Sequence, residues 1–257
     1  METDTLLKHL DHQLKWLQEQ KYSYLNLAPL SAEERLKLQR GLQSMMGSLN
    51  PSPVSPPPGP AASSNLHASS AIPSLQALQE QYCTCQRCPL GATRTNFVFG
   101  VGNPQTPLLF IGEGPGADED RLGEPFVGRA GKLLTKMIQS IGIDRRDVYI
   151  SNVVKCRPPN NRNPHAEEIA KCFPILKQQF ELINPQLIVT LGNVPTRALV
   201  PDAPGITRSR GQLFHYQHWK VLPTFHPAYL LRNPSAMAQS WEDFKKIRHL
   251  CFETTPA

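Results

Sequence analysis

Four short apolar segments limit the fold of this 257-residue chain more than any other feature. None of them alternates cleanly with polar residues, so each is predicted to be a strand buried on both faces. Helical patterns occupy the intervals between them, and such alternation indicates a parallel sheet covered by helices. We therefore predict an α/β fold, a three-layer α/β/α sandwich around a four-stranded parallel sheet. The predicted strands are residues 108–111, 148–150, 187–191 and 221–224, and the clearest helical patterns are 130–141 and 166–183.

Each predicted strand is followed at once by a loop of unusual composition. These loops read GEGPGADED, NVVKCRPPNN, GNVPT and HPAYLLRNP. In open α/β sheets ligands bind beyond the carboxyl ends of the strands. The sequence therefore predicts its functional site where these loops meet.

The chain divides into three predicted zones. Residues 1–46 carry two helical patterns: apolar residues share a face from Leu7 to Leu17, and Ser31 with Glu34 forms a capping box. This N-terminal helical extension is either a hairpin that packs on itself or a docking helix for a protein partner. Residues 47–74 are rich in Pro and Ser and are predicted to be a disordered linker. Residues 75–257 form the globular domain and carry the recognisable chemistry.

The positive charge of the chain lies in the globular part. Of the net charge of +6, none comes from residues 1–73, whereas residues 74–257 hold 21 Lys and Arg against 15 Asp and Glu. A basic surface of this kind suits a polyanion such as nucleic acid. No apolar run approaches the roughly 18 residues that span a bilayer, and the first 20 residues do not form a secretory signal. We expect a cytoplasmic protein without a membrane contact.

Six cysteines in a chain without an export signal indicate a metal site or catalysis and not disulfides. A C-x2-C turn joins two of them, and fifteen residues separate two others. Four thiolates suit either zinc or an iron–sulfur cluster, and the ligand type alone leaves both open, as it leaves open that the later two are simply buried small side chains. Cys83 and Cys251 are interpreted as bystanders. The candidate ligands are Cys85, Cys88, Cys156 and Cys172.

Seven segments, taken in order, resemble the family 4, thermophile-type uracil-DNA glycosylases over about residues 75–250. They are CQRCPLGATRTN, FVFGVGNP, LLFIGEGPGADED, EPFVGRAGKLL, YISNVVKCRPPNNRNP, LIVTLGN and TFHPAYLLRNP. The resemblance implies a base excision repair enzyme that flips uracil out of DNA and hydrolyses its N-glycosidic bond, leaving an abasic site. It also implies a 4Fe-4S cluster on the four candidate cysteines, which we predict to be structural because nothing in the chain suggests an electron partner. A related branch that bonds covalently to the abasic sugar has a basic insertion that KCRPPNNRNP lacks, so we expect a hydrolytic enzyme.

The resemblance assigns the base contacts to three residues. Phe126 would stack on the flipped uracil, Asn152 would read its edge, and His226 would donate a hydrogen bond to O2 as negative charge develops there. Each residue also has an ordinary alternative. An aromatic ring at a helix start is often core, an Asn at a strand end often caps a turn, and a His before Pro often sits in a turn.

The same resemblance places the remaining catalytic and binding residues on the polar loops. Glu113, with a lesser contribution from Glu119, would position the hydrolytic water and balance the positive charge on the sugar. Gly114 lets the backbone approach the ligand, and Asn161 supplies a further polar group. Ala117 stands where relatives often carry an acid, which bears on the water geometry. Candidates for DNA contact are Leu230, Leu231 and Arg232, and for phosphate contact Arg129, Lys132, Arg157, Arg162, Arg208 and Arg210.

Two other functions stay open at this point. The first is a non-catalytic iron–sulfur DNA-binding module associated with replication or repair, an alternative that the unmatched N-terminal helices favour. A zinc-binding module is the third possibility. For the enzyme we expect a monomer that binds uracil-containing DNA, with a possible protein partner for residues 1–46.

Overall fold

The computed structural model describes residues 74–253. The predicted N-terminal extension and all but the last residue of the predicted linker lie outside this range and remain predictions. Within it, no helix is long and apolar enough to cross a membrane. The α-helices are α3 (Leu75–Tyr82), α4 (Leu90–Thr93), α5 (Ala117–Leu122), α6 (Arg129–Ser140), α7 (Ala166–Ile183), α8 (Asn193–Leu199), α9 (Ile206–Ser209), α10 (Pro227–Arg232) and α11 (Met237–Arg248). Short 3-10 turns cover Arg145–Asp147, Pro159–Asn161 and Pro234–Ala236, and a π-helical turn covers His249–Glu253.

The sheet has six strands in the order β1-β3-β2-β4-β6-β5. Its four central strands run parallel to one another and correspond to the four predicted segments. Both edge strands pair antiparallel to their neighbours, so the sheet is mixed and larger than predicted. The edges escaped prediction because they have only two and three residues. The strands are β1 (Val101–Gly102), β2 (Leu108–Gly112), β3 (Tyr149–Asn152), β4 (Leu187–Leu191), β5 (Phe214–Tyr216) and β6 (Trp219–Thr224).

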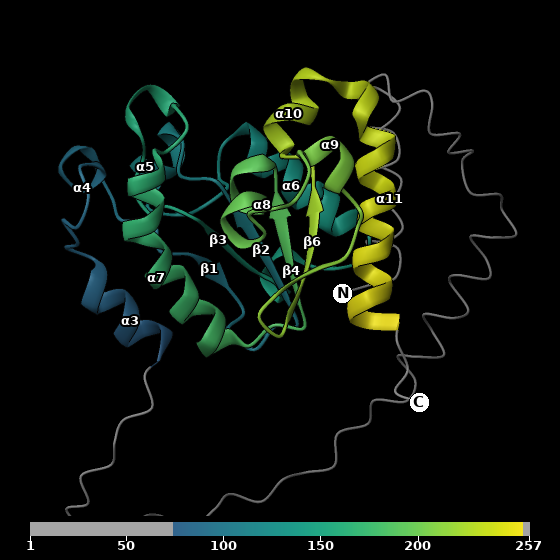
Figure 1. Cartoon of the computed structure of the whole chain (residues 1–257), viewed down its shortest axis with the longest axis horizontal. Coiled ribbons are helices and arrows are strands. Elements are labelled where there is room, and N and C mark those ends of the chain that lie inside the picture. The colour runs from purple at the N-terminus through teal and green to yellow at the C-terminus, as the bar shows by residue number, and fades with distance from the viewer. Residues whose placement is uncertain (1–73, 254–257) are drawn as a thin grey trace, which may run out of the picture. The chain divides into compact units, whose positions relative to one another are not determined.

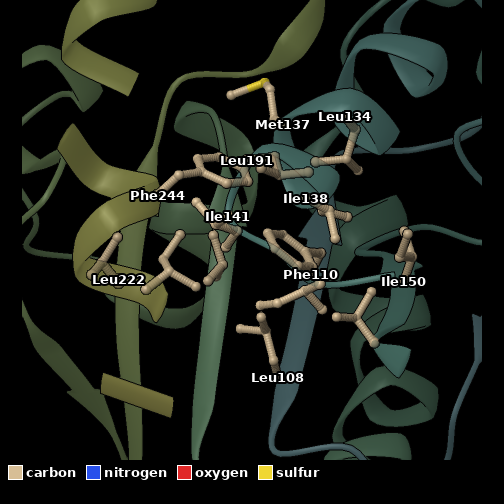
Figure 2. Packing of buried hydrophobic residues seen from close by; sticks show 14 of the residues in the cluster. Leu108, Phe110, Leu134, Met137, Ile138, Ile141, Ile150, Leu191, Leu222 and Phe244 are labelled. Carbon is tan, nitrogen blue, oxygen red and sulfur yellow. The ribbon is translucent and has the colours of Figure 1, made fainter. Parts of the chain in front are cut away.

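Helices bury both faces of the sheet, as the unbroken apolar segments require. Along β2, Leu108 and Phe110 point into one hydrophobic cluster, and Leu109 and Ile111 point into the other. Figure 2 shows the first cluster, where side chains of α6 and Phe244 of α11 pack on the strands. The second cluster lies against α3 and α7. Figure 1 accordingly shows the strands between α7 and α11.

The two long helices begin and end where the sequence predicts, to within a residue. In α6 the buried residues Leu134, Met137 and Ile138 recur at helical spacing, and Gly142 follows with φ 76°. The capping box of α7 joins His165 to Glu168, whose carboxylate accepts the His165 backbone N–H at 2.7 Å. These helices form the crossovers from β2 to β3 and from β3 to β4. Because β6 pairs parallel with β4, the strands β2, β3 and β6 all have their carboxyl ends at one edge of the sheet.

Candidate active site

A cavity of about 440 Å³ lies at the carboxyl ends of β2, β3 and β6. Its walls are the loops that follow these strands, together with the starts of α6 and α10. All the catalytic and substrate-binding residues predicted from the sequence line it: Glu113, Gly114, Glu119, Phe126, Asn152, Asn161 and His226. The fold therefore brings together side chains that are more than a hundred residues apart in the chain.

Asn152 is the last residue of β3 and is 2% exposed. Its Oδ1 atom is buried without a hydrogen-bond partner, one of two such side-chain atoms among residues 74–253. Gly112 pairs with it across the sheet, and a β-carbon at Gly112 would stand 2.4 Å from Oδ1 and 2.5 Å from Cζ of Phe126. An unpaired buried acceptor is costly in the absence of a ligand. The amide is therefore placed to accept a hydrogen bond from a molecule in the cavity.

Lys155 supports the backbone of Asn152 through a hydrogen bond. Its fully buried ammonium donates to the Asn152 carbonyl oxygen at 2.9 Å, to Ser151 Oγ at 2.5 Å and to Gln179 Oε1 at 2.6 Å. Burial lowers the pKa of Lys155 to about 7. Sequence reasoning missed this residue, although a lysine inside the apolar run NVVKC is a signal that could have found it.

Phe126 forms another wall of the cavity in a backbone conformation that is unusual for an aromatic residue. Its φ is 55°, and the side chain is 7% exposed. The ring centroid lies 5.7 Å from that of His226, with the planes tilted by 35°. The ring is thus fixed beside the imidazole and faces the cavity that Asn152 also lines.

Glu119 is engaged by the backbone of the same region. Oε1 accepts the backbone N–H groups of Val127 at 3.0 Å and Gly128 at 2.9 Å, and Oε2 accepts that of Gly116 at 3.2 Å. Three amide donors on one carboxylate tie the loop after β2 to the segment that carries Phe126.

His226 precedes α10 and caps it. Nδ1 accepts the backbone N–H of Ala228 at 3.1 Å, so the neutral ring carries its proton on Nε2. Burial, aided by the positive charge of Arg232, lowers the pKa of His226 to about 4. Near neutral pH the side chain is a neutral hydrogen-bond donor.

Glu113 follows β2 directly and is half-buried at the cavity wall. Burial raises the pKa of its carboxyl group above the ordinary value of 4.5. Asn161 also lines the cavity; it has φ 54°, is exposed, and its Oδ1 accepts a hydrogen bond from Arg157 Nε at 2.8 Å. The cavity thus combines an acid with a raised pKa, a neutral histidine and an amide.

The rim residues differ from the prediction for DNA contact. Leu230 is 1% exposed and belongs to the hydrophobic core, so its assignment to the DNA surface was wrong. The helical spacing of α10 turns that residue inward, whereas Tyr229 and Leu231 are each 38% exposed. Tyr229 also lines the cavity, which the sequence did not indicate. Arg232 lines the cavity too.

Two of the predicted phosphate-binding arginines are engaged in ion pairs. Arg162, at the cavity rim, forms two hydrogen bonds with the buried carboxylate of Glu168, at 2.7 and 2.9 Å. Arg210 pairs with the buried Asp243 at 2.6 Å. A side chain that already satisfies a buried carboxylate is a weaker candidate for a phosphate contact.

The four candidate ligand cysteines pack against one hydrophobic cluster. Cys156 and Cys172 are buried, and the other two are half-buried. Burial raises the pKa of Cys156 to about 11, against the opposing effect of the Arg94 guanidinium and with smaller contributions from the thiols of Cys172 and Cys88. Arg94 Nη1 lies 3.1 Å from Cys156 Sγ, and the Lys155 ammonium acts on both buried thiols. Sulfur atoms that influence one another beside two cations suit a group of net negative charge.

Within residues 74–253, no three Cys, His, Asp or Glu side chains are grouped closely enough to hold a single metal ion. The two predicted bystanders stand apart. Cys83 is exposed, and Cys251 packs against the other hydrophobic cluster, on the opposite face of the sheet.

Residues 99–247 match the family described as the uracil DNA glycosylase superfamily. The type-4 uracil-DNA glycosylase of Archaeoglobus fulgidus is 44% identical over 191 residues, which are 71% of this chain and 96% of that protein. The type-4 enzyme of Sulfurisphaera tokodaii is 46% identical over 69% of this chain and 84% of its own length. That of Thermotoga maritima is 51% identical over 63% and 85%. The chain belongs to the uracil-DNA glycosylase superfamily, among the type-4 proteins.

Proposed function

We propose that this protein is a base excision repair enzyme that flips uracil out of DNA and hydrolyses its N-glycosidic bond, leaving an abasic site. The observation that carries the proposal is the unpaired Oδ1 of Asn152 at a cavity that is already formed at the carboxyl ends of the strands. Relatives that are 44% to 51% identical are named type-4 uracil-DNA glycosylases, which supports the same activity.

Base recognition follows from the chemistry of the Asn152 amide. Oδ1 accepts the N3–H of uracil, and the amide N–H donates to O4. Cytosine offers an acceptor at N3 and a donor at its exocyclic amine, so both contacts would oppose it. A site that leaves a buried polar group unpaired with the wrong base discriminates strongly. Phe126, whose ring lies beside that of His226, stacks on the base.

His226 stabilises the departing base. Its Nε2–H donates to O2, where negative charge develops as the glycosidic bond breaks. A neutral donor in a water-poor site contributes about 3 kcal/mol in comparable cases. The low pKa of the imidazole keeps it in this form near neutral pH.

Glu113 is the residue that acts at the sugar. Its carboxylate orients the attacking water and balances the positive charge of the oxocarbenium-like transition state. Glu119 contributes less directly, because its carboxylate holds the loop that Glu113 and Gly116 belong to. Gly114 brings the backbone against the base, and Asn161 adds a polar contact at the rim.

A 4Fe-4S cluster held by Cys85, Cys88, Cys156 and Cys172 would be structural. When bound, it would crosslink the segment before α4, the loop after β3, and α7. Cys156 lies four residues after Asn152, so this crosslink would steady the base-reading end of β3. Arg94 is placed to balance its charge through the 3.1 Å contact with Cys156.

The basic surface of the globular domain would bind the DNA backbone. We expect the enzyme to act as a monomer in the cytoplasm. A protein partner for residues 1–46 remains part of the proposal.

A uracil-excision assay with two matched variants tests the proposal. Asn152→Ala removes the unpaired acceptor in the cavity, and Ser240→Ala removes the other unpaired buried atom, on α11. We expect the wild type to release free uracil from a uracil-containing oligonucleotide and to spare its cytosine counterpart. Asn152→Ala should lower kcat/KM at least about 100-fold, and Ser240→Ala should leave it unchanged. A wild-type protein that binds the oligonucleotide and releases no uracil would support the non-catalytic alternative instead.

A further inference from the structure

We propose that Arg145 is a positioning residue that holds the Phe126 ring in its stacking orientation. The inference rests on the proposed function, since it concerns the stacking step. Arg145 lies in the 3-10 turn between α6 and β3 and, of the residues described, is not among those that line the cavity. Any effect it has on the base must therefore pass through another residue.

The Phe126 backbone needs support from outside. At φ 55° an aromatic residue is in a conformation that is rarely populated, and such conformations persist only where surrounding contacts impose them. A freely relaxing Phe126 would move its ring, because φ sets the direction of the Cα–Cβ bond. The contacts that impose this φ thus also decide where the ring points.

Contacts fix the chain on both sides of Phe126. On the preceding residue, Arg145 Nη2 donates to the carbonyl oxygen of Pro125 at 2.7 Å. On the following residues, the Glu119 carboxylate accepts the N–H groups of Val127 and Gly128. One cation and one anion thus hold the two peptide units that flank the ring. Arg145 is the cationic half of this arrangement.

Arg145 also connects the loop to α6. Its Nη1 donates to Thr135 Oγ1 at 3.1 Å, and that hydroxyl donates to the Gly131 carbonyl oxygen at 3.1 Å. The guanidinium is half-buried, and this burial lowers its pKa from the ordinary value, while the carboxylates of Glu124 and Glu119 act in the opposite direction and favour the charged form. A planar fork with separate donors spans Pro125 and Thr135 together, and a lysine has only one nitrogen to offer.

The chain supplies a matched control in the next residue. Arg146 is exposed and pairs with Asp144 at 3.0 Å, away from the cavity. Arg145→Met and Arg146→Met make the same chemical change at neighbouring positions. We expect Arg145→Met to lower kcat/KM for uracil excision about 10-fold to 50-fold, and Arg146→Met to change it less than about 2-fold. Arg145→Lys should fall between Arg145→Met and the wild type.

A double-mutant cycle separates positioning from general stabilisation. If Arg145 acts through the ring, Arg145→Met should cost less than about 2-fold further activity in a Phe126→Ala background. If Arg145→Met lowered kcat/KM in the Phe126→Ala background as much as it does in the wild type, the proposal would be overturned. Thermal unfolding of each variant checks that the compared proteins are folded at the assay temperature.

Hydrogen exchange provides a readout that does not depend on activity. Arg145→Met should speed exchange in the segment 124–131 and leave α7 unchanged, whereas Arg146→Met should alter neither. Unchanged exchange in 124–131 would also overturn the proposal. A wild type that releases no uracil would defeat the proposed function alone, because the exchange experiment would still decide whether Arg145 orders the loop.

Discussion

The Nδ1 atom of His226 accepts the backbone N–H of Ala228 at 3.1 Å. This contact commits Nδ1 as an acceptor and leaves Nε2 to present the proton to the cavity. Protonation of Nδ1 would require this hydrogen bond to break. Its loss opposes protonation, as burial and the positive charge of Arg232 do when they lower the pKa of the ring. One backbone hydrogen bond thus sets the tautomer and favours the neutral charge state.

The first prediction concerns stability in acid. The folded-state pKa of His226 is about 4, below its unfolded value of 6.5, so the unfolded chain binds the extra proton first. The stability that this histidine contributes is complete above pH 6.5 and is lost as the pH falls towards 4. Between pH 7 and pH 5 the loss should be about 2 kcal/mol.

Urea unfolding of the wild type and of His226→Asn at both pH values measures this loss. Asn retains a side-chain oxygen that can cap α10 but does not titrate. The wild type should therefore lose more stability than the variant on acidification. Equal losses in the two proteins would show that the His226 pKa is not depressed.

The second prediction concerns the acid limb of the pH–rate profile. If the Glu113 carboxylate must be ionised, then kcat/KM should fall with acidity at a pH above the ordinary 4.5 of a glutamate, because burial raises its pKa. Glu113→Gln should lower the rate about 100-fold or more and remove this limb. Glu167→Gln, at an exposed acid in the first turn of α7, should keep both the rate and the limb. A Glu113→Gln profile with the wild-type limb would assign the limb to another group.

The sequence predicted the parts of the fold that depend on local patterns. The four unbroken apolar segments became the four central parallel strands, and the loop positions put Asn152 and His226 at the cavity. The short strands β1 and β5 carry too few residues to show a period, and only their pairing to β3 and β6 defines them. Leu230 was misplaced because a six-residue helix was read as surface, whereas its helical turn aims that side chain at the core.

The residues that support the site were the hardest to predict, because their partners are remote in sequence. Lys155 reaches Gln179, 24 residues away, and Arg145 reaches Pro125, 20 residues away. Neither contact leaves a periodic trace in the sequence. Arg145, within the polar segment DRRD, resembles an ordinary surface cation, and Lys155 is marked only by its apolar neighbours. Predicting that side chains meet a ligand needs only the strand order, but predicting what holds them needs the packing of the crossovers.

The third prediction concerns the cysteines. Cys156→Ala should lose the broad visible absorbance of an iron–sulfur cluster and lower Tm by about 10 °C, because metal binding contributes directly to folding free energy. Cys251→Ala is the matched control, since that thiol is partly buried on the opposite face of the sheet. It should keep the absorbance. A colourless wild type that contains zinc would contradict the iron–sulfur assignment.

The fourth prediction concerns Gly131 in α6. Alanine normally stabilises a helix interior by about 1 kcal/mol relative to glycine. Here a β-carbon at Gly131 would stand 1.8 Å from the Phe126 carbonyl oxygen and 2.6 Å from its Cα, so the Phe126 segment would have to move. Gly131→Ala should therefore lower the free energy of unfolding by about 2 kcal/mol or more and reduce uracil excision at least about 100-fold.

Gly205→Ala is the control for this change, because a β-carbon there meets nothing within 4 Å. It should alter stability by less than about 0.5 kcal/mol and leave excision intact. Urea unfolding and the excision assay on the two variants complete the comparison. A Gly131→Ala protein as stable and as active as Gly205→Ala would mean that the Phe126 segment can shift without cost, and the case for a rigid stacking platform would fail with it.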